Sequence, residues 1–334
     1  MNHHPKPVTR GDVAKRAGVS TAVVSYVLNN GPRAVALKTK ERVLKAVEEL
    51  GYSPNAVARA LKVRRTNTIG LIVPDISNPY FAELSKAIED SAFTRGYSLL
   101  VGNSSNDPER EQMQIETLRG RQVDGLLLVR TSHRKEHTIL QVGGLATVVL
   151  DRAIPNERLS SVVVDNFGGA YAAVRHLIGH RHRSIACIGG PLGAPLADER
   201  VRGWMAAMAE EGLPTSNLCI RGSYSRLGGY EAALELLNRD QRPTAVFASS
   251  DLQGVGALRA CYELDVRVPN DLAVFAFDGT SEAAFTAPPL SVVQQDMSRL
   301  AESAVSLVLS DLIAANPVHH TAPFNLVLRH SCGC

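Results

Sequence analysis

Apolar and polar positions in the first fifty residues repeat with the period of short helices. Val13, Ala14 and Ala17 fall on one face of a helix that Thr9 can cap, and Asp12 stands three residues later in the position of a capping box. The segment is too short to build a core alone, so this face predicts packing against neighbouring helices.

A second and a third helix are predicted after a tight corner. Gly18 permits a left-handed corner, and Ser20 can cap the helix that follows it. Apolar residues then recur at helical spacing over about 39–50, which predicts the third helix. The second helix would turn short or polar residues outward: Thr21, Ala22, Ser25, Tyr26 and Asn29.

Three helices around one small core, with polar groups at the start of the second, are typical of a helix-turn-helix that enters a major groove. Charge favours this reading over a purely structural cap. Residues 1–65 hold 13 Lys and Arg against 4 Asp and Glu, whereas the rest of the chain has a net charge of −6. Such a basic block can be a solvated surface, but it is more typical of a module that binds a polyanion.

The segment PNAVARALK, residues 54–62, predicts a short helix that is marginal in water alone. Pro54 suits the start of a helix and Asn55 suits its cap, while Ala58 and Leu61 are small or apolar. A basic, polar linker follows.

From Ile69 onward, short apolar runs alternate with amphipathic segments of helical length. This alternation predicts parallel sheets covered on both faces. The runs are IGLIV, YSLLV, GLLLV, ATVVL, SVVVD, SIACI, AVFAS and LAVFAF, with a further strand at FNLVLRH.

Polar residues recur where these strands end, and ligands of such sheets bind beyond the carboxyl ends of the strands. Any one of these residues can be a helix cap or a turn former, but their repetition predicts a binding site. They are Asp75, Asn78, Asp151, Arg152, Ser250, Asp251 and Asp278.

No apolar run approaches the roughly 18 residues that cross a bilayer, and no signal peptide is evident, so we expect a cytoplasmic protein without membrane contact. The C-terminal CGC could bind metal or form a redox pair, but no His or Cys cluster lies near it in the sequence. We interpret HRH at 180–182 as a basic helix end. No metal and no cofactor are therefore expected.

Long stretches of the chain closely resemble the lactose/galactose-repressor (LacI/GalR) family of bacterial transcription regulators. They include VTRGDVAKRAGVSTAVVSYVLNN, TKERVLKAVEELGYSPNAVARALKVRRTNTIGLIVPDISNPYF, VDGLLLV, RVRGW, SSDLQGVGAL and PPLSVVQQD. NNGPRAV is similar to the actinobacterial branch. The resemblance implies a multidomain fold: an all-α helix-turn-helix DNA-binding domain plus an α/β core of two subdomains, like the type I periplasmic binding proteins.

The resemblance also implies domain bounds. These are 1–53 for the helix-turn-helix, 54–66 for a hinge helix and linker, and 67–334 for the effector-binding and dimerisation core. One subdomain would comprise about 67–165 and 295–322, and the other about 166–292 and 323–334. The crossings between them are expected near Val164–Asn166, Val292–Gln295 and His320–Phe324.

By resemblance, Thr21, Ala22 and Tyr26 would read bases, while the hinge would place Leu61 in the minor groove as a wedge. Many members have Arg where this chain has Tyr26, and Tyr lacks the bidentate guanine contact of Arg. The full set of implied DNA-binding residues is Thr9, Ser20, Thr21, Ala22, Ser25, Tyr26, Asn29, Asn55, Ala58 and Leu61.

An effector site is implied in the same way. A sugar is favoured, with a nucleoside or another small metabolite as the alternative. The chain has AFDG at 276–279 where GFDD is frequent, so one acidic group is missing. The implied residues are Asp75, Asn78, Phe81, Asp151, Arg200, Tyr224, Ser250 and Asp278.

Two other classes of protein fit the sequence less well. A solute-binding protein would need a signal peptide, and an enzyme with a DNA-binding appendage would need a catalytic motif. No phosphate loop, H-E-x-x-H or G-x-S-x-G occurs, and GVGALR at 254–259 lacks the third glycine of a dinucleotide site. We therefore expect a non-enzymatic repressor that acts as a homodimer on palindromic operator DNA.

Overall fold

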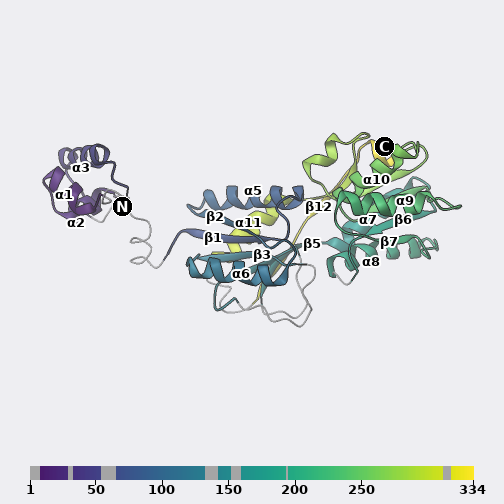
Figure 1. Ribbon diagram of the computed structural model, residues 1–334, viewed down its shortest axis with the longest axis horizontal. Coiled ribbons are helices and arrows are strands. Elements are labelled where there is room, and N and C mark those ends of the chain that lie inside the picture. The colour runs from purple at the N-terminus through teal and green to yellow at the C-terminus, as the bar shows by residue number, and fades with distance from the viewer. Residues whose placement is uncertain are drawn as a thin grey trace, which may run out of the picture. The chain divides into compact units, whose positions relative to one another are not determined.

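The computed structural model describes residues 8–28, 33–53, 65–131, 142–151, 159–192, 195–310 and 317–334. It divides into two compact units, Met1–Thr66 and Asn67–Cys334. Figure 1 labels the elements of each unit. Among the described residues, no helix combines the length and the apolar character needed to span a membrane.

The first unit is a three-helix bundle of α1 (Arg10–Ala17), α2 (Thr21–Leu28) and α3 (Leu37–Leu50). The predicted capping box of α1 is confirmed: Thr9 N donates to Asp12 Oδ2 at 2.8 Å, and Asp12 N donates to Thr9 Oγ1 at 3.3 Å. Gly18 ends α1 with a φ of 64°. The bundle therefore begins and turns as its sequence predicts.

The third helix begins at Leu37, two residues before the predicted start. Leu37 is largely exposed, so the first turn adds nothing to the apolar face from which the helix was predicted. The small core of the unit is shared by all three helices and comprises Val13, Ala14, Ala17, Val24, Val27, Val43 and Ala46.

The second unit contains two six-stranded sheets. The first sheet has the order β11-β5-β4-β3-β1-β2, and all its neighbouring strands are parallel. Its elements are β1 (Thr68–Val73), α5 (Pro79–Phe93), β2 (Ser98–Asn103), α6 (Pro108–Gly120), β3 (Gly125–Val129), β4 (Thr147–Leu150), β5 (Ser160–Val164), α11 (Met297–Val308) and β11 (His319–Ala322).

The second sheet has the order β12-β10-β9-β8-β6-β7, and its β10–β12 pair is antiparallel. Its elements are α7 (Asn166–Gly179), β6 (Ile185–Gly189), α8 (Pro195–Glu210), β7 (Cys219–Arg221), α9 (Arg226–Leu237), β8 (Ala245–Ala248), α10 (Asp251–Glu263), β9 (Ala273–Asp278), η1 (Ser281–Phe285), β10 (Ser291–Gln295), β12 (Phe324–Val327) and η3 (His330–Cys332).

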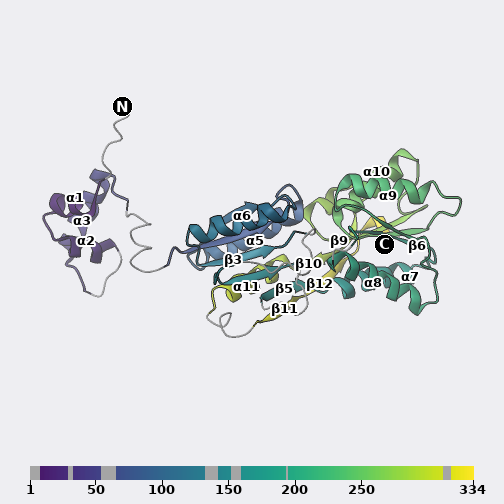
Figure 2. The ribbon, with the colours of Figure 1, turned by 60° about the horizontal axis from the view of Figure 1, so that its bottom comes forward.

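Helices cover both faces of each sheet. Helices α5 and α11 share one core of the first sheet, and α6 packs on the opposite face. In the second sheet, α7 and α8 lie on one side and α9 and α10 on the other (Figure 2). All the apolar runs predicted as strands form strands, and inner strands such as β3 and β9 are buried along their whole length, as parallel strands covered on both faces require.

Along the described residues the chain passes between the sheets at three places. It leaves the first sheet after β5, returns to it after β10, and leaves it again between β11 and β12. The segment Val292–Gln295, where the second crossing was expected, is part of β10, so this crossing follows Gln295. Both subdomains are therefore assembled from segments far apart in the sequence.

Candidate effector cavity and DNA-binding face

The second helix of the first unit presents its first turn to solvent. Thr21 and Ala22 are exposed, and Ser25 and Tyr26 are half-buried. Ser20 caps the helix, since Val23 N donates to its Oγ at 3.4 Å. The predicted residues Asn29, Asn55, Ala58 and Leu61 lie outside the described residues.

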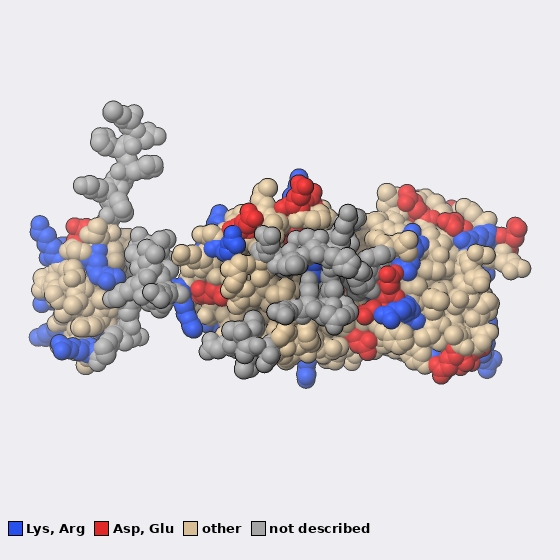
Figure 3. Space-filling view, turned by 90° about the horizontal axis from the view of Figure 1, so that it is seen from below, with Lys and Arg blue, Asp and Glu red and all other residues tan. Residues whose placement is uncertain are grey.

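Basic side chains are exposed on this small unit. Figure 3 shows Lys and Arg spread over the visible face of the unit, with little acidic surface among them. Thr9, one of the predicted DNA-binding residues, is exposed at the start of α1. A duplex carries about one negative charge per 1.7 Å of its axis, so a basic face with an exposed helix N-terminus fits DNA.

The second unit holds a cavity of about 230 Å³ whose lining comes from both subdomains. All the predicted effector-site residues line it, although many lie far apart in the sequence. The lining residues are Asp75, Asn78, Tyr80, Phe81, Asn106, Asp151, Pro191, Arg200, Ser223, Tyr224, Ser225, Ser250 and Asp278.

The lining residues sit at strand ends and helix starts, as parallel sheets require. Asn78 caps α5 by accepting from Tyr80 N, and Ser250 caps α10 by accepting from Gln253 N. Asp278 is the last residue of β9, with a φ of 113°. Asn78 and Ser250 therefore both cap a helix and line the cavity.

Arg200, from α8, is only 2% exposed and contributes a cation to the cavity wall. Its Nε donates to Asn166 Oδ1 at 2.9 Å, and its Nη1 donates to Asp278 Oδ1 at 3.2 Å and to the Ser249 carbonyl. Among the described residues, Nη2 has no recorded hydrogen bond. The guanidinium is thus held in place with donor capacity left for a ligand.

A hydrogen-bonded network joins the carboxylates of the two subdomains. Tyr80 Oη lies 3.3 Å from Asp151 Oδ1 and 3.0 Å from Gln295 Oε1, while Gln295 Nε2 donates to Asp278 Oδ1 at 3.2 Å. Burial raises the pKa of Asp278 to about 6, although the neighbouring Arg200 acts in the opposite direction. Burial and then Asp151 raise the pKa of Tyr80 well above its ordinary value, so its hydroxyl stays protonated.

Aromatic rings form the apolar part of the site. The Arg200 guanidinium carbon lies 3.8 Å from the centroid of the Phe277 ring and 6.0 Å from that of Tyr224. Tyr224 packs closely over Gly190, where an added Cβ would lie 2.2 Å from the tyrosine Cζ. The glycine is therefore needed for the ring of Tyr224 to lie where it does.

Several lining residues were missed by the sequence reasoning. Ser223 and Ser225 flank Tyr224 after β7, a three-residue strand that the apolar pattern did not predict. Tyr80 was overlooked beside Phe81, although an aromatic residue with a polar tip directly after a strand-end loop is a usable signal. Asn106, a further lining residue that was not predicted, lies shortly after the end of β2.

A direct contact also links the two subdomains beside the cleft. Ser281, in η1 of the second, donates from its N and its Oγ to Oε1 of Glu83 on α5, at 2.8 and 2.6 Å. The carboxylate accepts a pair of hydrogen bonds only while the two subdomains keep this separation. The contact therefore favours one arrangement of the cleft.

Asp251 follows the cavity-lining residue Ser250 and is expected to give the folded chain an unusual pH dependence of stability. Its Oδ2 accepts from Thr280 N and Oγ1 at 2.6 and 2.8 Å, and its buried Oδ1 has no partner in the described part of the chain. Burial raises its pKa to about 8. The unfolded carboxyl titrates near about 3.9, so the folded state binds more protons between about pH 4 and 8, and stability falls as pH rises through that window.

We expect Asp251→Asn, which mimics the protonated carboxyl, to be more stable relative to wild type at about pH 8.5 than at about pH 5, by at least about 1 kcal/mol. Urea unfolding can be followed through Trp204, the single tryptophan, which is buried in the second subdomain. Asp271→Asn is the control. The pKa of Asp271 is lowered to about 2 by its hydrogen bonds with Arg267, so this change should have the same effect at both pH values. If Asp251→Asn, like Asp271→Asn, changes the free energy of unfolding by the same amount at both pH values, the raised pKa of Asp251 is contradicted.

The surroundings of the C-terminal cysteines differ from expectation. In the sequence, His330 is the one histidine close to CGC, whereas the fold brings the Sγ of Cys334 to 3.4 Å from the Nε2 atoms of both His176 and His180. Because α7 and the segment after β12 pack together only in the folded state, sequence proximity could not show this. His180 does end α7, as predicted, and His182 instead contacts Thr244 Oγ1 at 3.0 Å.

The fold and the cavity define a class: a helix-turn-helix protein with a two-subdomain core of the periplasmic-binding-protein type. Comparisons with known proteins agree. Residues 10–55 match the family described as bacterial regulatory proteins, lacI family, and residues 174–332 match the periplasmic binding protein-like domain.

Similar proteins include the HTH-type transcriptional repressor PurR of Erwinia tasmaniensis, which is 40% identical over 89% of this chain and 88% of its own. PurR of Proteus mirabilis is 38% identical over 90% and 89%. The lac repressor dimer bound to operator and the anti-inducer ONPF superposes with a TM-score of 0.87 at 27% identity, covering 98% of this chain and 99% of its own. The CelR–cellobiose complex gives 0.72 at 31%, covering 97% and 99%.

The chain belongs to the LacI family of bacterial DNA-binding transcriptional repressors. Its first unit is the DNA-binding domain, and its second is an effector-binding core. The relatives are repressors rather than enzymes.

Proposed function

We propose that a small sugar binds in the cavity and switches the affinity of the chain for its operator. The proposal is based on one small cavity on which both subdomains converge, through Arg200, Asp151 and Asp278. A ligand that contacts both subdomains binds one of their arrangements better than the other, and this difference in affinity shifts the equilibrium.

The chemistry of the lining supports a polyhydroxyl ligand. Carboxylates accept hydrogen bonds from hydroxyls, and the Arg200 guanidinium can donate to their oxygens. The flat ring of Tyr224 suits the apolar face of a pyranose. The cavity is smaller than the roughly 300–1,000 Å³ of sites for drug-sized ligands, which favours a monosaccharide.

A nucleobase is the second candidate, because Phe81 and Tyr224 both line the cavity and a base can stack between or upon aromatic rings. The two candidates differ in what they ask of Asp151 and Asp278. A sugar presents vicinal hydroxyls to both carboxylates, whereas a base presents one or two N–H groups in its ring plane.

We also propose that the chain is cytoplasmic and non-enzymatic and that it binds a palindromic operator as a homodimer. A single recognition helix reads only a few base pairs, so a two-fold pair of helices is needed for a specific site. Thr21, Ala22 and Tyr26 would meet the bases, and Thr9, Ser20 and Ser25 the backbone. The lac repressor of similar fold is a dimer on its operator.

A thermal-shift panel of monosaccharides, disaccharides, nucleosides and nucleobases tests the effector class. A binder at 100 times its Kd stabilises the core by about 2.7 kcal/mol, which raises Tm by several degrees. We expect a monosaccharide to give the largest shift. A shift from nucleobases alone would replace the sugar with the second candidate.

A further inference from the structure

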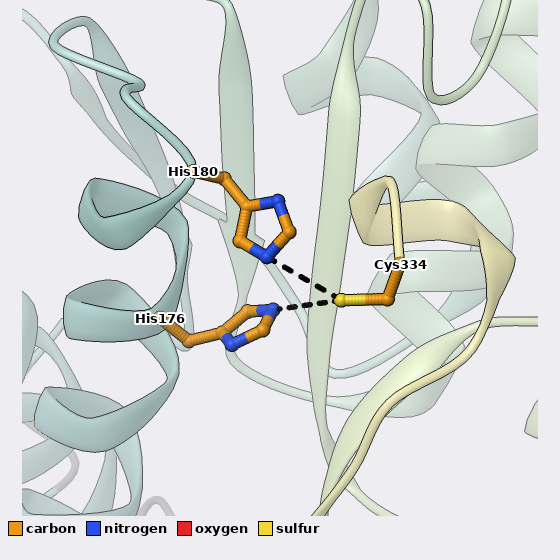
Figure 4. Close-up of side chains that lie close together, drawn as sticks. All are labelled: His176, His180 and Cys334. Atoms are coloured by element: carbon orange, nitrogen blue, oxygen red, sulfur yellow. Dashed lines mark hydrogen bonds between the residues drawn. The ribbon is translucent and has the colours of Figure 1, made fainter.

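The last turn of α7 and the chain after β12 bring histidines and cysteines together, on the second subdomain and outside the effector cavity. His176 lies in the last turn of the helix and His180 is its C-cap residue, and their ring centroids are 4.6 Å apart. Cys332 belongs to η3, and Cys334 follows it. Figure 4 shows both imidazoles directed at the sulfur of Cys334.

The distances within this cluster are those of ligands around one small cation. Sγ of Cys334 lies 3.4 Å from Nε2 of His176 and 3.4 Å from Nε2 of His180. The three ligand atoms all lie within 4.8 Å of one another. Tetrahedral zinc, with Zn–N of about 2.0–2.1 Å and Zn–S of about 2.3 Å, separates its nitrogen and sulfur ligands by roughly 3.5 Å.

Cys332 lies beside this group of three and offers a second thiol. Its Sγ lies 3.4 Å from Nε2 of His176, and its side chain is almost fully buried. Two thiols and two imidazoles form the donor set of closed structural zinc sites, and thiolate with imidazole favours zinc over magnesium or calcium. We propose that His176, His180, Cys332 and Cys334 bind a structural Zn²⁺ ion.

Metal ligands must be deprotonated, so the site would use neutral imidazoles and thiolates. On binding, each coordinating thiol gives its proton to solvent as the Zn–S bond forms.

The position of the cluster suggests what the ion does. Helix α7 is the first element after the first crossing, and the Cys332–Cys334 segment lies beyond the strand that follows the third crossing. A metal held by both clips these two parts of the second subdomain to each other. Zinc should therefore raise the Tm of the subdomain, because it binds the folded state alone.

Zinc competition against a chromophoric chelator tests the proposal on the full-length chain, stripped of metal and reduced with a phosphine. We expect one equivalent to bind with a Kd of about 1 µM or tighter, with a Tm rise of several degrees. Co²⁺ in the same site should give the visible absorption of tetrahedral cobalt and a thiolate-to-cobalt charge-transfer band.

His180→Ala and Cys334→Ser should each weaken zinc binding at least about 100-fold and abolish the charge-transfer band or change it. Both residues are exposed, so these variants should fold. His182→Ala and Cys219→Ser are matched controls and should bind as the wild type does. Zinc binding that is equal in all four variants, or no binding by the reduced chain, overturns the site. A chain that is isolated with a Cys332–Cys334 disulfide and takes up no zinc after reduction also overturns the site.

Discussion

Replacing Arg200 with alanine should weaken effector binding at least about 100-fold while leaving operator affinity without effector within about threefold. Two charge-assisted hydrogen bonds from a guanidinium are each worth about 1.5–3 kcal/mol, which gives this factor. Operator contacts come from the other unit of the chain and are unchanged. Calorimetry with the ligand found in the thermal-shift panel measures the first effect, and fluorescence anisotropy of labelled operator measures the second.

The change also leaves Asp278 buried without its cation, which costs stability. Arg200→Lys keeps the charge but not the fork, so it should fold and still lose at least about tenfold in effector affinity. Arg202→Ala, on the same helix but exposed and paired with Glu199, is the control and should bind normally. Undiminished affinity in folded Arg200→Lys and Arg200→Ala would place the effector elsewhere.

A fragment that begins at about Thr66 should keep the effector affinity of the whole chain and lose specific operator binding entirely. The first unit has its own small core, and the chain divides into compact units after Thr66. The fragment also loses the basic block and keeps an acidic remainder, so it should not bind random DNA either. Limited proteolysis, gel filtration and anisotropy would show a folded dimer that binds effector but no DNA.

The full-length chain in the same buffer is the control for this comparison. A fragment that fails to bind the effector would show that the cavity needs the first unit. A monomeric fragment would remove the proposal that the core holds the dimer together. Residual operator binding at physiological salt would contradict the assignment of DNA contacts to the first unit.

The helix-turn-helix could be predicted almost in full because its signals are local. The capping box of Thr9 and Asp12, and the left-handed Gly18, each depend on residues within one turn. The start of α3 could not be predicted to the residue, since the exposed Leu37 takes no part in the apolar pattern.

The cavity could be predicted because parallel sheets place strand ends at one edge. Asp75 and Asp278 are some two hundred residues apart, yet each follows or ends a buried strand. The strands β7, β10 and β11 were not among the predicted strands. Cys219–Arg221 is short and half-buried, and His319–Ala322 is mostly exposed and polar, so neither has an apolar run. In Ser291–Gln295 only two adjacent valines are apolar.

The histidine–cysteine cluster could not be predicted from the sequence because its halves are separated by about 150 residues. A single Cys-x-Cys has no partner until α7 packs beside the end of the chain. Only tertiary packing decides which of several histidines meets the sulfurs, and His180 rather than His182 does so.

We propose that effector binding and operator binding are linked through one chain, and reciprocal titrations measure this linkage. Operator selected from random duplexes by the full-length chain is titrated by anisotropy with and without the ligand that stabilises the core. We expect a palindromic site, a change in operator affinity of at least about fivefold, and the same factor in effector affinity when operator is added first. A ligand that fills the cavity and leaves operator affinity unchanged would contradict it.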